Sequence, residues 1–356
     1  MREGGLAVNF DALPVTITLA AFCLAAWVVW VSGTRLAVYA DEISDRFNLA
    51  KEFIGLIFLA TATELPEIVT TISAANAGNA KLVLGNMFGG VTMQTAILAV
   101  ADIFVVRNAL TSWPRKPTHA LEAVILVILL GVLLIIMLVG DVVIIFGIGL
   151  GAMCLSIAYP LAIVLLRQFD ERTSWAPIDI PEEPQPDGVR PFGRDRIRDA
   201  STRDLLTRSG LCVILILIAG YTLAQSADAI ADKTNLSASF VGVTLLAAST
   251  SLPELSTTLA AARIGAYTMA ISNIFGSNLI MLLLIFPADV FYRAGPILSE
   301  ADVATKFSLA AGIVVTAIYI AGILIRRTPK LFGAGLDSIF VLCIYFASLI
   351  ILYALQ

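Results

Sequence analysis

Long apolar stretches alternate with short polar turns along the whole chain. Ten of these stretches have the length, about 20 residues or more, that an α-helix needs to cross the hydrocarbon core of a bilayer. They cover residues 13–34, 51–77, 80–105, 118–139, 142–166, 209–231, 237–263, 266–292, 306–325 and 334–355. The pattern therefore predicts an all-α integral membrane protein with about ten transmembrane helices.

One connection differs from the short turns. Residues 167–208 contain five prolines, eight arginines and nine acidic residues, and few large apolar side chains. This composition is typical of a solvated linker between two halves. We expect residues 1–166 to form an N-terminal five-helix half, residues 167–208 a cytoplasmic linker, and residues 209–356 a C-terminal five-helix half.

The two halves share a repeat. Residues 33–104 align with residues 220–291 at a constant offset of 187 without a gap, and 28 of the 72 paired positions are identical. The first helices of the two copies are five spans apart, an odd number, so the second copy enters the membrane in the opposite orientation. Such repeats place equivalent residues on either side of a pseudo-twofold axis near the bilayer midplane. We therefore expect two inverted five-helix repeats.

The basic residues indicate the orientation of the chain. With the linker placed in the cytoplasm and the side alternated at each span, 18 of the 23 lysines and arginines lie on the cytoplasmic side. This distribution follows the positive-inside rule. We expect a multi-pass protein of the cell (plasma or inner) membrane whose two termini both face outward.

Composition excludes several classes of function. The chain is 58% hydrophobic and 14% charged, with a mean hydropathy of +0.90. The sequence shows no basic patch for nucleic acid, no Ser/His or Cys/His pair and no phosphate-binding loop, so neither a nucleic-acid-binding protein nor an enzyme is expected. No cofactor and no obligate protein partner is indicated, and the expected partners are membrane lipid and small cations. Cys23, Cys154, Cys212 and Cys343 fall in apolar stretches and are interpreted as core residues. His119 is interpreted as a surface residue, and Trp27, Trp30 and Trp113 as anchors at the membrane interface.

Each copy of the repeat carries a glutamate and a proline inside an apolar stretch. The first copy reads Thr-Glu-Leu-Pro-Glu over Thr63 to Glu67, and the second reads Thr-Ser-Leu-Pro-Glu over Thr250 to Glu254. A proline removes a backbone donor, which predicts free carbonyl oxygens around Ala60 to Thr63 and Ala247 to Thr250. Carbonyls beside carboxylates are hard oxygen ligands of the kind that Na⁺ and Ca²⁺ prefer.

The next span of each copy adds small and amide residues. Residues 85–90 read Gly-Asn-Met-Phe-Gly-Gly, and residues 272–277 read Ser-Asn-Ile-Phe-Gly-Ser. Glycine and serine let neighbouring backbones approach closely. Asn86 and Asn273 are neutral, and they can orient the glutamates or bind a cation directly.

Three glutamates require compensation in this setting. A carboxylate at the centre of a membrane helix costs about 2.5–3.5 kcal/mol on insertion scales. Glu64 and Glu67 are three residues apart and share one helix face, and the inverted repeat predicts that Glu67 and Glu254 face each other. A single glutamate beside a proline is explained by a structural kink, but two copies in one register, each followed 19 residues later by Asn-x-Phe-Gly, favour a binding site.

At these residues the chain resembles the cation/calcium antiporter superfamily, whose best-known members are the sodium/calcium exchangers, and it looks like a divergent prokaryotic-type member. That family carries inverted repeats with Gly-Thr-Ser-Leu-Pro-Glu followed by Gly-Asn-x-x-Gly-Ser-Asn. The second copy here reads Ser-Thr-Ser-Leu-Pro-Glu and Asn-Ile-Phe-Gly-Ser-Asn. The resemblance implies that Glu67 and Glu254 are the shared cation ligands. It also implies as ligands the backbone oxygens of Ala60, Thr63, Ala247 and Thr250 and the hydroxyl of Ser277.

Four positions depart from the family pattern. Glu64 stands where the first motif has serine, and Gly90 stands where the later serine is expected. Four positions further on, sodium/calcium exchangers have Asn in the first copy and Asp in the second, whereas this chain has Gln94 and Met281. One family carboxylate is therefore missing, and a different one, Glu64, is present. The candidate cation site comprises Glu64, Glu67, Glu254, Thr63, Thr250, Ala60, Ala247, Ser251, Asn86, Asn273, Ser277 and Gln94.

These features predict a secondary-active cation antiporter that exchanges Ca²⁺, or a similar cation, for Na⁺ by alternating access. Carboxylates in a low-dielectric site need a cation or a proton to neutralise them, which favours exchange over leak. A proton-coupled exchanger of the Ca²⁺/H⁺ or Na⁺/H⁺ type is the main alternative, because Glu64 adds a titratable acid. A passive cation channel or a membrane sensor is a further alternative, which counter-ion dependence of the flux would exclude.

Overall fold

The computed structural model describes residues 10–106, 109–114, 116–145, 147–172, 197, 200–232, 246–326, 329–331 and 334–355. In this part of the chain, eight helices are long and apolar enough to cross a membrane. A ninth span consists of two helical pieces, Lys51–Thr63 and Leu65–Asn76, which meet at an angle of 45°. The predicted all-α architecture of membrane-spanning helices is confirmed.

Apart from η1, α2 and η2, the described elements follow each other in the same order in the two halves. The first half contains η1 (Phe10–Ala12), α1 (Val15–Phe47), α2 (Lys51–Phe53), η2 (Ile54–Leu59), α3 (Ala60–Thr63), α4 (Leu65–Asn76), α5 (Ala80–Phe104), η3 (Leu110–Ser112), α6 (Thr118–Val139), β1 (Val143–Ile145), β2 (Ile148–Gly149) and α7 (Leu150–Arg172). The second half contains α9 (Thr202–Asp232), α11 (Ala247–Thr250), α12 (Leu252–Arg263), α13 (Tyr267–Phe291), η5 (Ile297–Glu300), α14 (Val303–Ile325), β3 (Lys330–Leu331), β4 (Ala334–Gly335) and α15 (Leu336–Ala354). The segment η2 is π-helical, and η1, η3 and η5 are 3₁₀-helical.

Two predicted spans of the first half have different boundaries in the structure. Helix α1 continues past residue 34 to Phe47, and an ion pair of 2.8 Å between Arg46 and Glu42 supports its last turn. Helix α7 begins at Leu150, later than predicted, because β1 and β2 form an antiparallel hairpin before it. The residues of this hairpin are β-branched, and Gly147 adopts a positive φ of 86° in its turn.

Helices also take in both ends of the stretch predicted as a linker. Helix α7 continues to Arg172, and α9 begins at Thr202. The interior of the predicted linker lies outside the described residues. The predicted span 237–263 is described from residue 246 onward, as α11 and α12.

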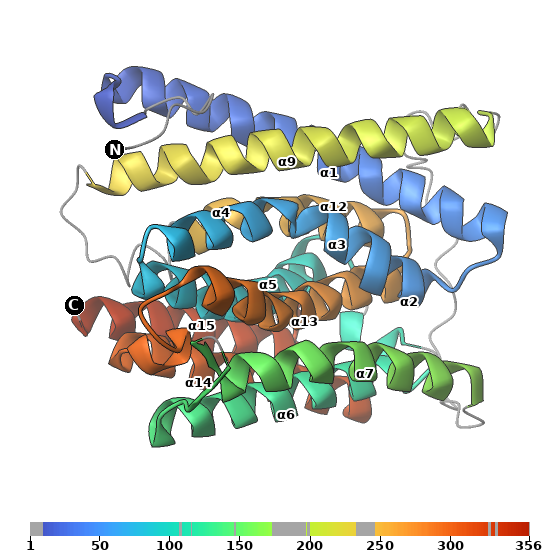
Figure 1. The fold of residues 1–356 in the computed structure, drawn as a ribbon. Coiled ribbons are helices and arrows are strands. Elements are labelled where there is room, and N and C mark those ends of the chain that lie inside the picture. The colour runs from blue at the N-terminus through green and yellow to red at the C-terminus, as the bar shows by residue number, and fades with distance from the viewer. Residues whose placement is uncertain are drawn as a thin grey trace.

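The two long helices α1 and α9 lie side by side across one face of the bundle (Figure 1). They run in opposite directions: α1 starts at the end of the molecule where the N-terminus lies, and α9 starts at the other end (Figure 1). Helices α3, α4 and α12 lie below them, followed by α5 and α13, with α6, α7, α14 and α15 on the far side (Figure 1). The opposite directions of α1 and α9 agree with an inverted repeat.

Reciprocal contacts between the halves follow the same symmetry. A Cβ atom on Gly33 of α1 would meet the side chain of Ser256 and the carbonyl of Pro253, the latter at 3.4 Å. A Cβ atom on Gly220 of α9 would meet the ring of Pro66. Since both glycines and both prolines are related by the offset of 187, each long helix packs against the broken helix of the other half.

Two equivalent aspartates tie the ends of α5 and α13 to both halves. Each accepts hydrogen bonds from two backbone N–H groups: those of Leu110 (2.6 Å) and Gly335 (2.8 Å) for Asp102, and those of Ile297 and Gly149 (2.6 Å each) for Asp289. In each case one donor lies in the following loop and the other in the hairpin of the opposite half. Both carboxylates are buried, so they hold the fold together and do not face solvent.

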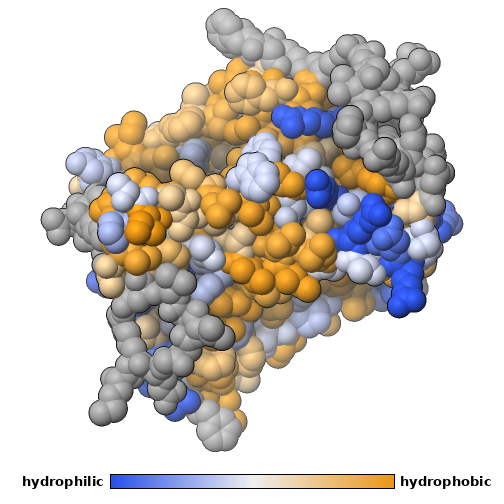
Figure 2. Space-filling model, turned by 90° about the horizontal axis from the view of Figure 1, so that it is seen from above, coloured by the Kyte–Doolittle hydropathy of each residue, from blue (hydrophilic) through white to orange (hydrophobic). Residues whose placement is uncertain are grey.

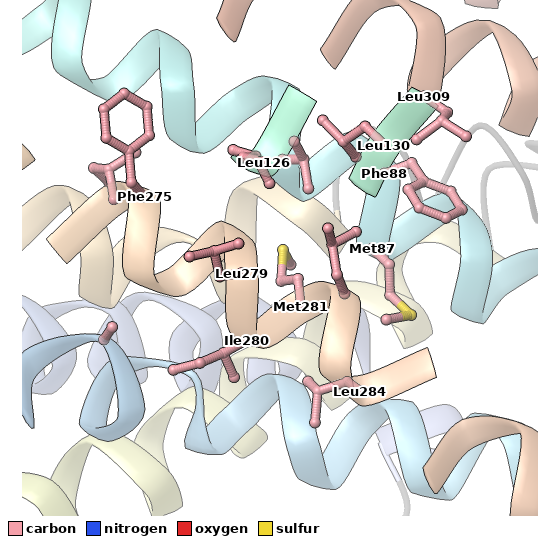
Figure 3. Packing of buried hydrophobic residues seen from close by; sticks show 14 of the residues in the cluster. Met87, Phe88, Leu126, Leu130, Phe275, Leu279, Ile280, Met281, Leu284 and Leu309 are labelled. Carbon is pink, nitrogen blue, oxygen red and sulfur yellow. The ribbon is translucent and has the colours of Figure 1, made fainter. Parts of the chain in front are cut away.

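Apolar residues cover the outside of the molecule as well as its core. On the face formed by α1 and α9, hydrophobic residues occupy the middle, and hydrophilic residues gather at the end where α9 begins (Figure 2). Inside, the largest cluster includes Phe88, Phe275 and Met281, drawn in Figure 3. A membrane helix is apolar all around, so its sequence does not show which face packs inward.

Two interpretations from the sequence are wrong for this reason. Cys23, Cys154 and Cys343 are exposed, which leaves Cys212 as the buried cysteine of the four. Trp113, expected at the membrane interface together with Trp27 and Trp30, is buried and stacks on Tyr267 with ring centroids 4.6 Å apart. In both cases an apolar or aromatic residue type was compatible with lipid and with protein, and tertiary packing decided between them.

Candidate cation site

A proline begins the second piece of each broken helix. Pro66 and Pro253 lie in the first turn of α4 and α12, where a helix tolerates the missing N–H. The carbonyls of Ala60 and Ala247 each accept a backbone N–H, from Glu64 (3.0 Å) and Ser251 (2.9 Å). These two carbonyls are therefore paired, while each proline lacks the N–H for the carbonyl four positions before it, which lies within the predicted stretches 60–63 and 247–250.

The breaks bring three glutamates together. One carboxylate oxygen from each of Glu64, Glu67 and Glu254 lies within 4.8 Å of the other two. All three side chains are fully buried. Glu67 and Glu254 come from equivalent positions of the two halves, and the structure brings them face to face as an inverted repeat requires.

Of the six carboxylate oxygens in this cluster, one is hydrogen-bonded within the described residues. Glu64 Oε1 accepts a bond of 2.8 Å from the side-chain amide of Gln94, while Glu64 Oε2 and both oxygens of Glu67 and Glu254 have no partner. Buried polar atoms in proteins are nearly always paired, and an unpaired buried carboxylate is costly. The arrangement therefore fits a site that a cation or a proton completes.

Two threonines each lie beside a glutamate of the opposite half. Thr63 lies beside Glu254, and Thr250 lies beside Glu67, both outside hydrogen-bond geometry. Each hydroxyl instead donates to a carbonyl of its own helix, Thr63 to Leu59 and Thr250 to Leu246, both at 3.0 Å. Because the hydroxyl proton is turned toward the backbone, the oxygen keeps lone pairs for a cation.

The remaining candidates lie around this centre. All twelve predicted site residues are at most 2% exposed. Asn86 Oδ1 lies 3.4 Å from the hydroxyl oxygen of Thr250, and the amide of Asn273 donates to Thr257 (3.0 Å) and Thr258 (3.1 Å). Four further oxygens of these residues have no partner in the described part of the chain: Gln94 Oε1, Asn273 Oδ1, Ser251 Oγ and Ser277 Oγ.

Two of the four departures from the family pattern touch each other. A Cβ atom on Gly90 would lie 3.0 Å from the sulfur of Met281, and Met281 is buried among the apolar side chains of Figure 3. The thioether occupies the space beside position 90, so a larger residue there would require the Met281 side chain to move. Beside Gly90 and Met281 the site is therefore apolar. Its third carboxylate, Glu64, stands on the broken helix of the first half.

Sequence reasoning missed a second buried polar group. His119 is not a surface residue, as predicted, but is fully buried, with Nδ1 3.1 Å from Glu122 Oε2. The hydroxyl of Ser272 on α13 lies 3.0 Å from the same ring nitrogen. The one signal in the sequence is the spacing of His119 and Glu122, three residues apart on an otherwise apolar helix. Asn278, whose amide lies 3.4 Å from the Thr95 hydroxyl, was also not singled out.

Comparison with known proteins agrees with this geometry. The family model described as "Sodium/calcium exchanger protein" matches residues 17–175 and 207–354. The "Putative antiporter CaxA" of Alkalimonas amylolytica is 26% identical over 270 residues, which are 76% of this chain and 79% of the relative. The "Inner membrane protein YrbG" of Escherichia coli (strain K12) is 23% identical over 275 residues, 76% of this chain and 78% of the relative.

A solved structure shows the same fold. The sodium-calcium exchanger NCX_Mj superposes with a TM-score of 0.68 at 18% sequence identity, covering 95% of this chain and 99% of NCX_Mj. The helical spans, the duplicated motif and the match of the family model over most of both halves agree with one another. The chain therefore belongs to the sodium/calcium exchanger protein family and is a multi-pass membrane cation antiporter.

Proposed function

We propose that the protein exchanges Ca²⁺, or a similar cation, for Na⁺ across the membrane by alternating access. The observation that carries this proposal is the cluster of Glu64, Glu67 and Glu254, drawn from both halves and buried without a counter-charge among the described residues. Carboxylates in a low-dielectric interior cannot all stay charged without a cation or a proton. Oxygen ligands of this kind suit Na⁺ and Ca²⁺.

The number of carboxylates determines how much positive charge the site must bind to be neutral. Three ionised glutamates are neutralised by three Na⁺ ions, or by one divalent cation and one proton. An incompletely neutralised site is costly to close off from water, so the protein reorients when loaded and one ion replaces another. Exchange is then favoured over leak.

The ligands divide between the two halves. Glu67 and Glu254 bind the divalent cation at the centre, with the oxygens of Thr63 and Thr250 beside them. Glu64, which lies next to Ser277 and accepts a bond from Gln94, holds the remaining positive charge as Na⁺ or H⁺.

Glu64 also favours a second candidate, a proton-coupled cation exchanger. Its Oε1 is held by the amide of Gln94, and its Oε2 has no partner in the described structure. A carboxyl group held on one oxygen is able to take up a proton on the other without displacing a ligand. In this mechanism the proton gradient replaces the sodium gradient as the driving force.

The topology belongs to the proposal as well. We place the protein in the cell membrane with residues 167–208 in the cytoplasm and both termini outside, on the basis of the 18 to 5 distribution of basic residues. Single cysteines introduced near the ends of α7 and α14 into a cysteine-free variant, and labelled from one side of intact cells, test this orientation. Labelling of either position from outside by an impermeant reagent contradicts it.

Flux through purified protein in liposomes tests the function. We expect uptake of radioactive Ca²⁺ that depends on an outward Na⁺ gradient and is unaffected by a K⁺ gradient. Uptake driven by an outward H⁺ gradient alone supports the proton-coupled candidate. A cation conductance without any counter-ion contradicts both antiport mechanisms and identifies a channel.

A further inference from the structure

A buried polar cluster lies between α6 and α13, apart from the three glutamates of the cation site. It consists of His119 and Glu122 on α6 and Ser272 on α13, none of which is exposed. The Ser272 hydroxyl lies 3.0 Å from His119 Nδ1 and 2.9 Å from Glu122 Oε1, and Nδ1 lies 3.1 Å from Glu122 Oε2. His119 Nε2 has no hydrogen-bond partner within the described residues. Each of the three side chains contacts the other two, and the cluster joins α6 to α13.

The charged groups that face the ring are acidic. Glu122 stands on the same helix, and Glu52 on α2 and Asp170 on α7 are close enough to interact with the imidazole. Helix α13 contributes the neutral Ser272. Burial disfavours a charge on the single histidine of the chain, and these three acids from three elements oppose that effect.

The neighbouring cations are engaged elsewhere. Lys116 pairs with Asp170 at 2.8 Å. Directly after α14, Arg326 donates to the carbonyls of Ser112 and Pro114, at 3.1 and 2.7 Å. In the described part of the chain, the imidazole is thus the basic group in contact with Glu122.

We propose that His119, Glu122 and Ser272 form a proton-binding site, separate from the cation site. The proton resides on the imidazole, so that the Nδ1–H group donates to Glu122 Oε2 while the Ser272 hydroxyl donates to Glu122 Oε1. Loss of the ring proton from Nε2 leaves Nδ1–H bonded to Glu122 but removes the positive charge beside this buried carboxylate. Because an uncompensated buried anion is unfavourable in a low-dielectric interior, the carboxylate favours the protonated ring.

Helix α13 connects this site to the cation site. Ser272 is followed by Asn273, whose amide donates to Thr257 and Thr258 on α12. The same α12 carries Glu254. A change at Ser272 when the proton leaves therefore acts on the contact between α13 and α12. This coupling rests on the proposed function, since it assumes that Glu254 binds the transported cation, and linkage makes it reciprocal.

The single histidine allows a direct test. Full-length protein carrying isotope-labelled histidine, reconstituted in lipid nanodiscs, gives a ring-nitrogen NMR spectrum of this site alone. We expect an imidazolium spectrum at neutral pH. In Glu122→Gln the proton affinity of the ring falls by about tenfold or more, because the carboxylate partner is gone. A neutral ring at pH 7 in the wild-type protein overturns the proposal.

Ser272→Ala provides the matched variant, because it keeps both titrating groups. We expect the ring to stay protonated in Ser272→Ala. The ring-nitrogen spectrum of Glu122→Gln itself also shows whether that variant still folds. Titrations of the wild-type ring with and without saturating Ca²⁺ test the coupling: a shifted midpoint that Ser272→Ala abolishes supports it, and superimposable curves overturn it. A protonated ring in a protein that fails to exchange cations in liposomes refutes the proposed function and leaves the proton site standing.

Discussion

At the scale of single residues, Glu67 and Glu254 are the most informative side chains. Both are fully buried, neither has a hydrogen-bond partner among the described residues, and they stand at equivalent positions of the repeat. A structural carboxylate would be expected to accept bonds from the backbone, as Asp102 and Asp289 do. This contrast distinguishes Asp102 and Asp289, which stabilise the fold, from Glu67 and Glu254, whose oxygens are available to bind a ligand.

Neutralising either central glutamate is expected to stop exchange. Glu67→Gln and Glu254→Gln each reduce Na⁺-dependent Ca²⁺ uptake in liposomes by about a hundredfold or more, because a divalent cation loses a charged ligand. The thermal stability of both variants in cation-free buffer is unchanged or raised, since repulsion between buried carboxylates is relieved. Glu300→Gln, at an exposed position, is the control. Normal exchange by either central variant contradicts the site.

Glu64→Gln reduces the positive charge that the site must bind to be neutral. With two carboxylates left, two Na⁺ ions or one divalent cation suffice for neutrality. We expect the Hill coefficient for Na⁺ activation of Ca²⁺ efflux to fall from about three to about two, with Ca²⁺ binding retained. An unchanged Hill coefficient shows that Glu64 does not take part in neutralising the transported ions.

At the scale of elements, equivalent acids hold the ends of α5 and α13. Asp102 and Asp289 each bind one N–H in the following loop and one in a hairpin of the opposite half. The neighbouring hairpins β1–β2 and β3–β4 were not predicted, because their short strands lie next to longer apolar stretches. These carboxylates fix the frame within which the broken helices hold their glutamates.

Removing one of these acids is expected to destabilise the frame. Asp289→Ala loses two hydrogen bonds to a charged acceptor and lowers the stability by about 3–6 kcal/mol. Asp302→Ala removes the N-cap bond of α14 to the N–H of Thr305 (2.8 Å) and costs about 1 kcal/mol. Unfolding of both variants in detergent measures the difference, and equal midpoints contradict the role of Asp289.

At the scale of the whole molecule, α1 and α9 form a separate layer over the broken helices (Figure 1). The contact relies on small residues, since Gly33 faces Pro253 and Ser256 and Gly220 faces Pro66. The reciprocal pairing places one long helix over each broken helix. We propose that movement of this layer alternates access to the site.

A larger residue at these glycines is expected to slow transport. Gly220→Val inserts a side chain against Pro66 and lowers the maximal exchange rate by about tenfold, with the half-saturating Ca²⁺ concentration changed less than twofold. Gly210→Val on the same helix is the matched control, because no atom lies within 4 Å of a Cβ at Gly210. Equal rates for the two variants would argue against movement at this contact.

Much of the fold follows from the sequence. Membrane-spanning length and a repeat at constant offset are properties of consecutive residues. The spans were therefore readable without a structure, and the repeat predicted an inverted duplication with which the structure agrees. The same symmetry predicted that Glu67 and Glu254 meet. The breaks at Pro66 and Pro253 followed from the missing N–H of proline.

Pairings between distant residues were decided by the tertiary structure. The sequence did not show that Gln94 bonds to Glu64, that Met281 fills the space beside Gly90, or that His119 is buried. Membrane helices are apolar on every side, so hydrophobic periodicity does not tell a lipid-facing side chain from a core one. Hydropathy along the chain therefore determined where this protein crosses the bilayer, and only the packing of helices decided which of its polar groups meet inside.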